Sequence, residues 1–225
     1  VSICEGARVL ANTGLLAGKV AVTHWAVLPD LIKSHPETRW LRDRRYVQDG
    51  AVITTSGVTA AIPFSLALVE AIGGRATAVA TARRVGVESW SAFHRTADFA
   101  FAKDDLAGAR KAMAATATHE AMEIPIADGV DEVALSLRAD AWVRSYRTTV
   151  LTTRAGKAPV VSRHGLTILP DAEAGAGQFS KPNSGEPAVV QLNTAITEMG
   201  QRYGPAAARM ARLGMEYDGA PPAGD

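Results

Sequence analysis

Short apolar runs alternate with stretches of helical periodicity along the whole chain. Runs of four to eight β-rich residues predict strands, and apolar residues recurring every three to four positions predict helices. The predicted elements of the first part are strands at 1–3 and 19–23, helices at 6–16 and 28–33, a hairpin formed by 40–47 and 51–55, and a long helix at 58–85. Asp49-Gly50 marks the hairpin turn and Gly73-Gly74 a break in the long helix. Strands separated by helices predict an α/β fold with a mostly parallel sheet.

The second part of the chain repeats this alternation after an Ala-rich stretch. Its predicted elements are a helix at 104–117, a strand at 123–127, a helix at 131–145, a strand at 148–152, a hairpin at 159–169, a loop at 175–187 and a final helix at 189–217. Gly204-Pro205 predicts a break in that last helix. The pattern predicts a domain at 1–90, a helical connector at 91–118, a second α/β segment at 119–218 and a disordered tail at 219–225.

Composition narrows the class of protein. The chain has 225 residues, of which 47% are hydrophobic and 21% charged, so a folded core is expected rather than disorder. The formal charge of +1 gives no electrostatic reason to expect nucleic acid or a membrane surface as a partner. No apolar run suggests a membrane span. With one cysteine, neither an internal disulfide nor a thiolate metal cluster can form, so a cytoplasmic location is expected.

That cysteine is the leading candidate for chemistry. Cys4 follows an apolar run, Gly6 comes two residues later, and a helix is expected at once. A strand–turn–helix arrangement of this kind is a nucleophile elbow, which exposes the side chain at the carboxyl end of a sheet. The unpaired N–H groups of a helix start favour a thiolate, and the backbone N–H of Glu5 would be an oxyanion donor. The alternative is a buried cysteine that acts only as a small apolar side chain.

His24 is the candidate partner of Cys4. It lies at the end of the next predicted strand, and adjacent parallel strands would bring both residues to one edge of the sheet. The competing interpretation is that His24 ends the strand and packs beside Trp25. His94, His119 and His164 are scattered without metal-ligand spacing, so no metal site is predicted.

Several ordered motifs in residues 1–90 resemble the ThiJ/PfpI family of the class I glutamine amidotransferase-like superfamily. They are Cys4-Glu5-Gly6-Ala7 with Leu10-Ala11, Gly14-Leu15-Leu16-Ala17-Gly18, Thr23-His24-Trp25, Tyr46-Val47-Gln48-Asp49-Gly50, Thr54-Thr55-Ser56-Gly57-Val58-Thr59-Ala60 and Leu66-Ala67-Leu68-Val69-Glu70. The resemblance is nearest to the branch of isocyanide hydratases and the sensing domains of AraC-type regulators. It implies that residues 1–90 are the C-terminal half of such a domain, beginning at the elbow.

The resemblance implies a flavodoxin-like three-layer sandwich, a homodimer, catalysis by Cys4, and a pocket that includes Glu5, Gly6, Ser56 and Gly57. The acid and the oxyanion loop of the family would precede Val1, in the first half of the domain, which this chain lacks. Two departures count against a hydratase: Glu5 stands where hydratases carry threonine, and Pro63 where this branch often has aspartate.

The second α/β segment, from Met122, is loosely similar to the start of a ThiJ/PfpI domain. It is either a degenerate second copy or a completion of the first domain in permuted order. In that alignment the family's acid falls near Ala134, which cannot polarise a thiol.

Two functions from different classes follow. The first is a cysteine-dependent hydratase, hydrolase or amidase acting on a small electrophile without metal or organic cofactor. The second is a non-catalytic domain that senses a small molecule, without DNA-binding helices of its own. Beside these two functions, a third hypothesis is an interaction module in which the second segment supplies oligomer contacts. All of them have a small molecule or a second copy of the chain as partner, and neither nucleic acid nor membrane.

Overall fold

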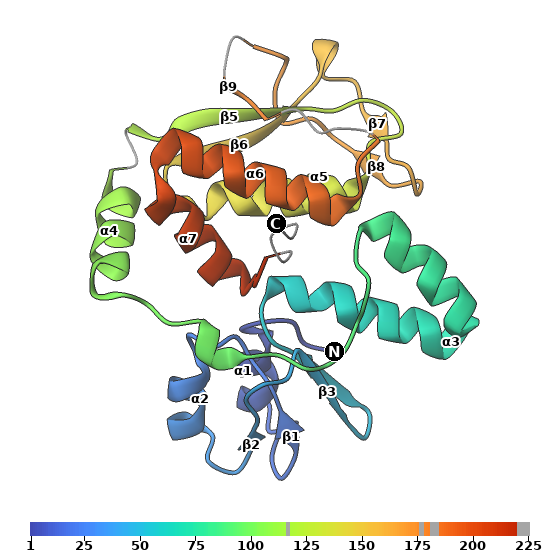
Figure 1. Cartoon of the computed structure of the whole chain (residues 1–225), viewed down its shortest axis with the longest axis vertical. Helices are drawn as coiled ribbons and strands as arrows, with labels where there is room; N and C mark the ends of the chain where they lie inside the picture. Colours follow the sequence, from blue (N-terminus) through green and yellow to red (C-terminus); the bar gives the residue numbers. More distant parts are fainter. Residues whose placement is uncertain (116–117, 176–177, 181–184, 220–225) are drawn as a thin grey trace, which may run out of the picture. The chain divides into compact units, whose positions relative to one another are not determined.

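A computed structural model describes residues 1–115, 118–175, 178–180 and 185–219. Two compact units make up the chain (Figure 1). Unit 1 comprises Val1–Arg83, Val87–Ala100 and Leu213–Asp218, and unit 2 comprises Arg84–Gly86, Phe101–Arg212 and Gly219–Asp225. The sequence predicted a family-like domain at 1–90, a connector at 91–118 and a second segment at 119–218, and this division stays a prediction. The short segment Leu213–Asp218 joins unit 1 although more than a hundred residues separate it from Ala100.

Unit 1 contains two small sheets. β1 (Val20–Ala21) pairs in parallel with β2 (Arg39–Trp40), and β3 (Tyr46–Asp49) pairs antiparallel with β4 (Val52–Thr55). The hairpin predicted at Asp49-Gly50 is confirmed, and Gly50 adopts the left-handed φ of 61° that the turn requires. Ser2 forms a parallel bridge with Thr54, which places the N-terminal segment beside β4.

Two short helices, α1 (Gly6–Asn12) and α2 (Leu28–Ser34), belong to this unit. The second agrees with the prediction, whereas the first ends four residues before the predicted end at Leu16. Gly14 and Gly18 adopt positive φ values of 77° and 71°, so the chain turns there instead of continuing as a helix. Leu16 is nevertheless buried, in a cluster with Ala11 and Ala21.

The long helix α3 (Ala61–Val85) is preceded by a 3₁₀ turn, η1 (Val58–Ala60). Its backbone leaves helical geometry at Gly74, with φ 80° and ψ 165°, as the sequence predicted, and Figure 1 shows the two arms diverging there. Contrary to the sequence-based expectation, Val58–Val85 is long and apolar enough to cross a membrane by length and composition, and 22% of its 18-residue apolar window is buried. Each arm alone is shorter than the about 20 residues of a membrane-spanning helix.

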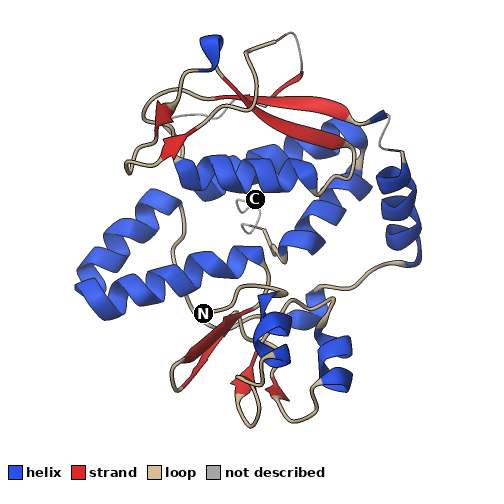
Figure 2. Cartoon of the chain, turned by 180° about the vertical axis from the view of Figure 1, so that it is seen from behind, coloured by secondary structure: helices blue, strands red, loops and turns tan. Residues whose placement is uncertain are grey.

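Unit 2 is a parallel sheet covered by helices on one face. β5 (Glu120–Pro125) lies between β6 (Thr148–Thr153) and β9 (Gln178–Phe179), parallel to both. α5 (Glu132–Val143) connects β5 to β6, and Figures 1 and 2 show it beside α6 (Ala188–Tyr203) against the sheet. A turn at Asp128-Gly129 leads into α5, whose N-cap is Asp131, a carboxylate that accepts from two backbone N–H groups.

The remaining elements of unit 2 are short. β7 (Val160–Val161) and β8 (Thr167–Ile168) form the predicted hairpin, and α4 (Lys103–Ala114) matches the Ala-rich stretch. Gly204, with a φ of 87°, separates α6 from α7 (Pro205–Met215) as predicted. The sequence did not predict β9, which lies in the segment taken as a loop. Parts of that loop and residues 220–225 of the predicted tail lie outside the described residues.

Each unit has its own buried apolar clusters. In unit 1, Leu66, Ala78, Ala82 and Trp90 pack between the arms of α3 and the segment that follows. In unit 2, Ile124, Ile126, Leu135 and Val160 pack the sheet against α5. The predicted α/β class is therefore confirmed. The sheets of the described residues have two or three strands each, three of the five strand pairings being parallel.

Candidate functional site

Cys4 occupies a strained turn between the N-terminal segment and α1. Its φ of 57° lies in the left-handed region, which residues with a Cβ seldom adopt. The turn is closed by a hydrogen bond from the N–H of Gly6 to the carbonyl of Ile3 (2.9 Å), and the cysteine is half-buried. This backbone geometry is the kind that a nucleophile elbow requires.

The register of the parallel bridge brings Cys4 toward the end of β4. Ser2 donates its N–H to the carbonyl of Ile53 (2.8 Å) and accepts from the N–H of Thr55 (2.9 Å). Cys4 follows Ser2 by two residues and Ser56 follows Thr54 by two residues, so both come just after this bridge. The predicted pocket residues Ser56 and Gly57 therefore follow β4 at the edge where the elbow lies.

The residue before His24 links the end of β1 to the elbow. Thr23 is buried, and its hydroxyl donates to the carbonyl of Cys4 at 3.0 Å. His24 is also buried; its Nδ1 accepts from the N–H of Ala26 at 3.2 Å, and its ring lies 5.5 Å from that of Trp25. The packing beside Trp25 that the sequence left open is present, and the segment that carries His24 contacts the segment that carries Cys4.

Glu5 and Gly6 lie on the exposed side of this turn. The Glu5 carboxylate pairs with Arg8 at 3.2 Å and its side chain is 58% exposed. A Cβ placed on Gly6 would meet only the Cβ of Ser2, at an ordinary 3.5 Å. The backbone N–H of Glu5, and not its side chain, thus stays the predicted contribution to an oxyanion site.

Ser56 and Gly57 are packed against the far end of the chain. Ser56 donates its N–H to the carbonyl of Arg45 (2.7 Å), and its buried hydroxyl has no hydrogen-bond partner within the described ranges. A Cβ on Gly57 would come within 2.2 Å of the Cβ of Glu216 and 2.9 Å of the Met215 carbonyl oxygen. A glycine is therefore required at position 57 because Glu216 occupies the space of a side chain.

His94 and Glu216 form a buried pair that the sequence analysis missed. His94 Nε2 lies 2.7 Å from Glu216 Oε1, and each side chain is 1% exposed. His94 had been set aside because it lacks metal-ligand spacing, and Glu216 carries no motif. Their separation of 122 residues leaves no local sequence signal, so only the tertiary structure could reveal this pair.

A second recess in unit 1 is lined by Tyr46, Glu70, Arg75 and Trp90, among others. Trp90 Nε1 donates to the Glu70 carboxylate at 2.7 Å, Arg75 pairs with the same carboxylate at 3.1 Å, and the guanidinium lies 4.3 Å from the Trp90 ring centre. Burial, followed by the nearby Glu70 charge, raises the pKa of the Tyr46 hydroxyl. Because these polar groups already bind one another, the recess is a weaker candidate for a ligand.

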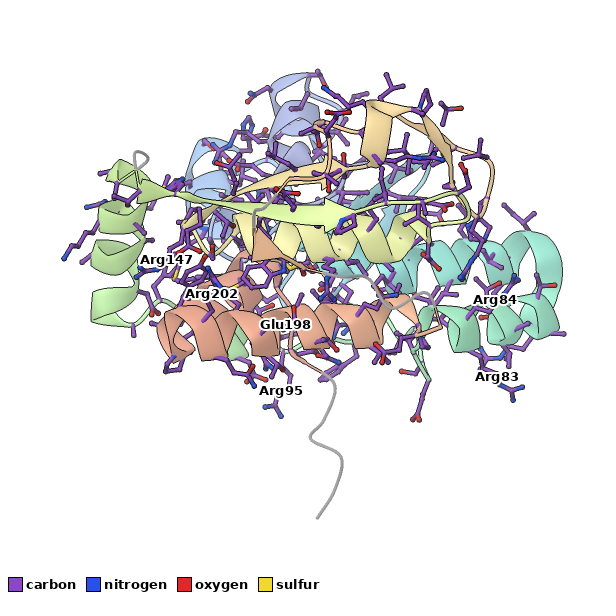
Figure 3. The ribbon with its side chains drawn as sticks, turned by 90° about the horizontal axis from the view of Figure 1, so that it is seen from above. Arg83, Arg84, Arg95, Arg147, Glu198 and Arg202 are labelled. Atoms are coloured by element: carbon purple, nitrogen blue, oxygen red, sulfur yellow. The ribbon has the colours of Figure 1, made fainter. Side chains whose placement is uncertain are left out.

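Unit 2 carries a charged cluster around Tyr203, at the end of α6. Figure 3 shows Arg147 and Arg202 close together, and their guanidinium groups lie 5.8 and 5.4 Å from the Tyr203 ring centre. Hydrogen bonds from Arg202 and from the Tyr203 hydroxyl lower the pKa of the Glu120 carboxyl. Burial is the largest cause that raises the pKa of Tyr203. Over the described residues, no three His, Cys, Asp or Glu side chains are grouped to hold a metal ion.

The comparisons with known proteins agree with the resemblance predicted from the motifs. The model of the DJ-1/PfpI family matches residues 1–71. Residues 1–71 are therefore similar to the DJ-1/PfpI family. The isonitrile hydratase of Pseudomonas putida is 44% identical over 80 residues, which make up 34% of this chain and 32% of that protein. This chain therefore spans about a third of the length of that curated relative.

Among solved structures, a similar chain was also found. The crystal structure of a ThiJ/PfpI family protein from Pseudomonas syringae covers 42% of this chain and 47% of its own, at 16% sequence identity and a TM-score of 0.27. That likeness is too low to carry an argument about the site. The DJ-1/PfpI assignment rests on the sequence match, which includes Cys4, His24, Ser56 and Gly57 within residues 1–71.

Proposed function

We propose that the DJ-1/PfpI segment acts on a small electrophile through Cys4, in a hydratase type of reaction. The observation that carries the proposal is the left-handed turn at Cys4, whose carbonyl accepts a hydrogen bond from Thr23 and which follows the bridge between Ser2 and Thr54. The similarity to an isonitrile hydratase supports the same chemistry. The flavodoxin-like sandwich and the homodimer implied by the family belong to this proposal.

For an isocyanide substrate, the proposed steps balance as follows. The Cys4 thiolate adds to the terminal carbon, which takes a proton, and a thioimidate forms with a new carbon–sulfur bond. Water then adds to the carbon–nitrogen double bond, the carbon–sulfur bond breaks, and an N-formamide leaves as the thiolate is restored. His24 moves the protons, and the backbone N–H of Glu5 stabilises negative charge that develops beside the elbow.

The non-catalytic alternative keeps the same pocket as a sensor for a small molecule. One observation favours it: Glu216 fills the space beside Gly57 with a carboxylate, the place that a small ligand would take. In this case a ligand replaces Glu216 at the Ser56–Gly57 edge without turnover.

Alkylation of Cys4 against pH distinguishes the two functions. Since the chain has a single cysteine, mass spectrometry reads the reaction at one site. An active elbow should give an apparent pKa well below the about 8.5 of a free thiol. His24→Gln should change this profile, whereas His164→Gln, at an exposed site in unit 2, should not.

Turnover then tests the reaction itself. Incubation with an alkyl isocyanide should yield the corresponding N-formamide by mass spectrometry, and Cys4→Ala should abolish it. A slow alkylation rate that does not depend on pH, together with no formamide, would reject the catalytic proposal and leave the sensor.

A further inference from the structure

The surroundings of Glu216 resemble a binding site for a carboxylate. Gly57 and His94 contact its side chain and Thr59 contacts its backbone carbonyl, and these three residues are called the carboxylate seat below. All of them belong to unit 1. The proposed thiol chemistry uses neither His94 nor Glu216, so the seat requires an explanation of its own.

His94 supplies the polar contact of the seat. Its Nε2 lies 2.7 Å from Glu216 Oε1, where an N–H donor facing a carboxylate oxygen is expected. The imidazole is stacked on Phe99, with ring centres 5.1 Å apart, and its own backbone N–H donates to the Asp43 carbonyl at 3.2 Å. The ring is thus oriented by contacts that do not depend on Glu216.

Gly57 and Thr59 supply the shape of the seat. With no Cβ at position 57, the Glu216 side chain lies directly on the backbone. The Thr59 hydroxyl contacts the carbonyl oxygens of Glu216 at 2.9 Å and Met215 at 3.3 Å. The second oxygen of the carboxylate, Oε2, is buried and has no hydrogen-bond partner in the described part of the chain. The seat therefore contacts one carboxylate oxygen and leaves the other for a further donor.

The segment Leu213–Asp218 is held in place by unit 1 on both sides of Glu216. Trp25 Nε1 donates to the Leu213 carbonyl at 2.9 Å, and Arg45 forms an ion pair with Asp218. Glu216 itself has a left-handed φ of 54°, a conformation that persists in a residue with a Cβ only where its surroundings impose it. The segment is thus fixed by its contacts and not by local preference.

We propose that His94 and Gly57 form a binding site for a small carboxylate, which the chain fills with its own Glu216, while Thr59 holds the backbone of the segment that carries Glu216. The ligand class is a monocarboxylate the size of the Glu216 side chain, such as acetate or propionate. Binding of such a ligand displaces Leu213–Asp218 from the Ser56–Gly57 edge. The inference goes beyond the proposed function, because it requires no reaction at Cys4.

The Glu216 side chain competes with a free carboxylate for the same contacts. Because Glu216 is part of the same chain, its effective concentration at the seat corresponds to a millimolar or higher level of free carboxylate. Removing the side chain or loosening the segment is therefore needed before a weak ligand can be detected.

The first experiment uses the 225-residue chain with Glu216→Ala. Its thermal midpoint is measured in increasing sodium acetate against sodium chloride of equal ionic strength. Acetate should raise the midpoint of Glu216→Ala in a saturable manner by mass action, and it should leave the wild type at its chloride value. Adding His94→Gln should remove the acetate effect. Glu198→Ala, which removes the carboxylate that pairs with Arg138 in unit 2, is the matched control and should not respond.

A second variant keeps every seat residue and Glu216 itself. It provides a test if Glu216→Ala does not fold. Arg45→Ala removes only the partly exposed ion pair with Asp218. In this variant acetate should compete with Glu216 and accelerate proteolytic cleavage within residues 213–218, whereas chloride should not.

Acetate without effect on either variant, or an equal effect on the His94→Gln double variant, overturns the proposal. Repeating the titration on Cys4→Ala separates this outcome from the proposed thiol chemistry. The acetate response should persist there, because the proposed contacts of acetate do not include Cys4.

Discussion

The hydroxyl of Thr23 donates a 3.0 Å hydrogen bond to the carbonyl of Cys4, and this contact joins the end of β1 to the candidate elbow. Without it the carbonyl of a residue with a φ of 57° would lose a buried partner. The contact explains how a turn of high local energy persists beside a short helix. It also places the residue before His24 directly against the candidate nucleophile.

Thr23→Val should therefore destabilise unit 1. The substitution keeps the shape of the side chain and removes the donor, so the free energy of unfolding should fall by about 0.5–1.5 kcal/mol. Urea unfolding, with hydrogen exchange of residues 1–100 to locate the effect, measures this loss. Thr23→Ser should recover most of it. Thr13→Val, where an exposed hydroxyl bonds the Leu10 carbonyl, should change little, and an equal loss there would contradict the assignment.

Gly57→Ala should be more damaging than a typical glycine substitution. The φ of Gly57 is −63°, which alanine adopts readily, so the cost comes from the contact with Glu216 and not from the backbone. Overpacking of this kind costs about 1–3 kcal/mol. Thermal unfolding measures it.

Gly108→Ala is the control for that prediction. A Cβ at Gly108 in α4 meets nothing within 4 Å, so this helical substitution should be neutral or stabilising by up to about 1 kcal/mol. Equal effects of the two substitutions would show that Gly57 is not constrained by Glu216.

Arg138→Met should strongly destabilise unit 2. The guanidinium is buried and donates to the Ser180 hydroxyl at 2.5 Å, the Gln191 carbonyl at 3.3 Å and the Glu198 carboxylate at 2.8 Å. Breaking a buried pair costs about 3–5 kcal/mol, and the partial exposure of Glu198 favours the lower end. Chemical denaturation monitored by circular dichroism measures the change.

Arg144→Met provides the comparison at the C-terminal end of the same helix. Arg144 pairs with Asp140 at 3.0 Å on a partly exposed face, and such a pair contributes about 0.3–0.5 kcal/mol. If Arg138→Met cost no more than Arg144→Met, burial would not be the factor that makes Arg138 important.

Acid should weaken unit 2 through Glu120. Hydrogen bonds from Arg202 and then Tyr203 lower the pKa of this carboxyl in the folded state below its ordinary value. The folded state thus binds a proton less readily than the unfolded state. The contribution is complete above the unfolded pKa of about 4.3 and is lost as the pH falls through the folded pKa.

Glu120→Gln tests that dependence. Its urea midpoint between about pH 6 and about pH 2.5 should fall less steeply than that of the wild type. Tyr203→Phe should give an intermediate slope, because it removes the 2.9 Å hydrogen bond and keeps Arg202. Parallel curves for the three proteins would exclude Glu120 as a source of the acid sensitivity.

The local features of the fold were predictable where a single residue type dictates the backbone. Asp49-Gly50 specified a hairpin, Gly204-Pro205 a helix break, and Asp131 with its neighbours a helix start, because turn and cap preferences act over a few residues. The end of α1 was predicted too late, since the apolar position of Leu16 also fits a buried turn. β9 was missed because only its pairing with β5 makes it a strand.

Some features of the candidate site were also predictable from the sequence, and others were visible only in the structure. The sequence by itself determined the family segment, its single cysteine and the motif residues that follow each short strand, because these signals are contiguous or closely ordered along the chain. Only the tertiary structure decided that Glu216 fills the space beside Gly57 and binds His94. Contacts between residues more than a hundred positions apart depend on how whole elements pack, and no periodicity or spacing in the sequence encodes them.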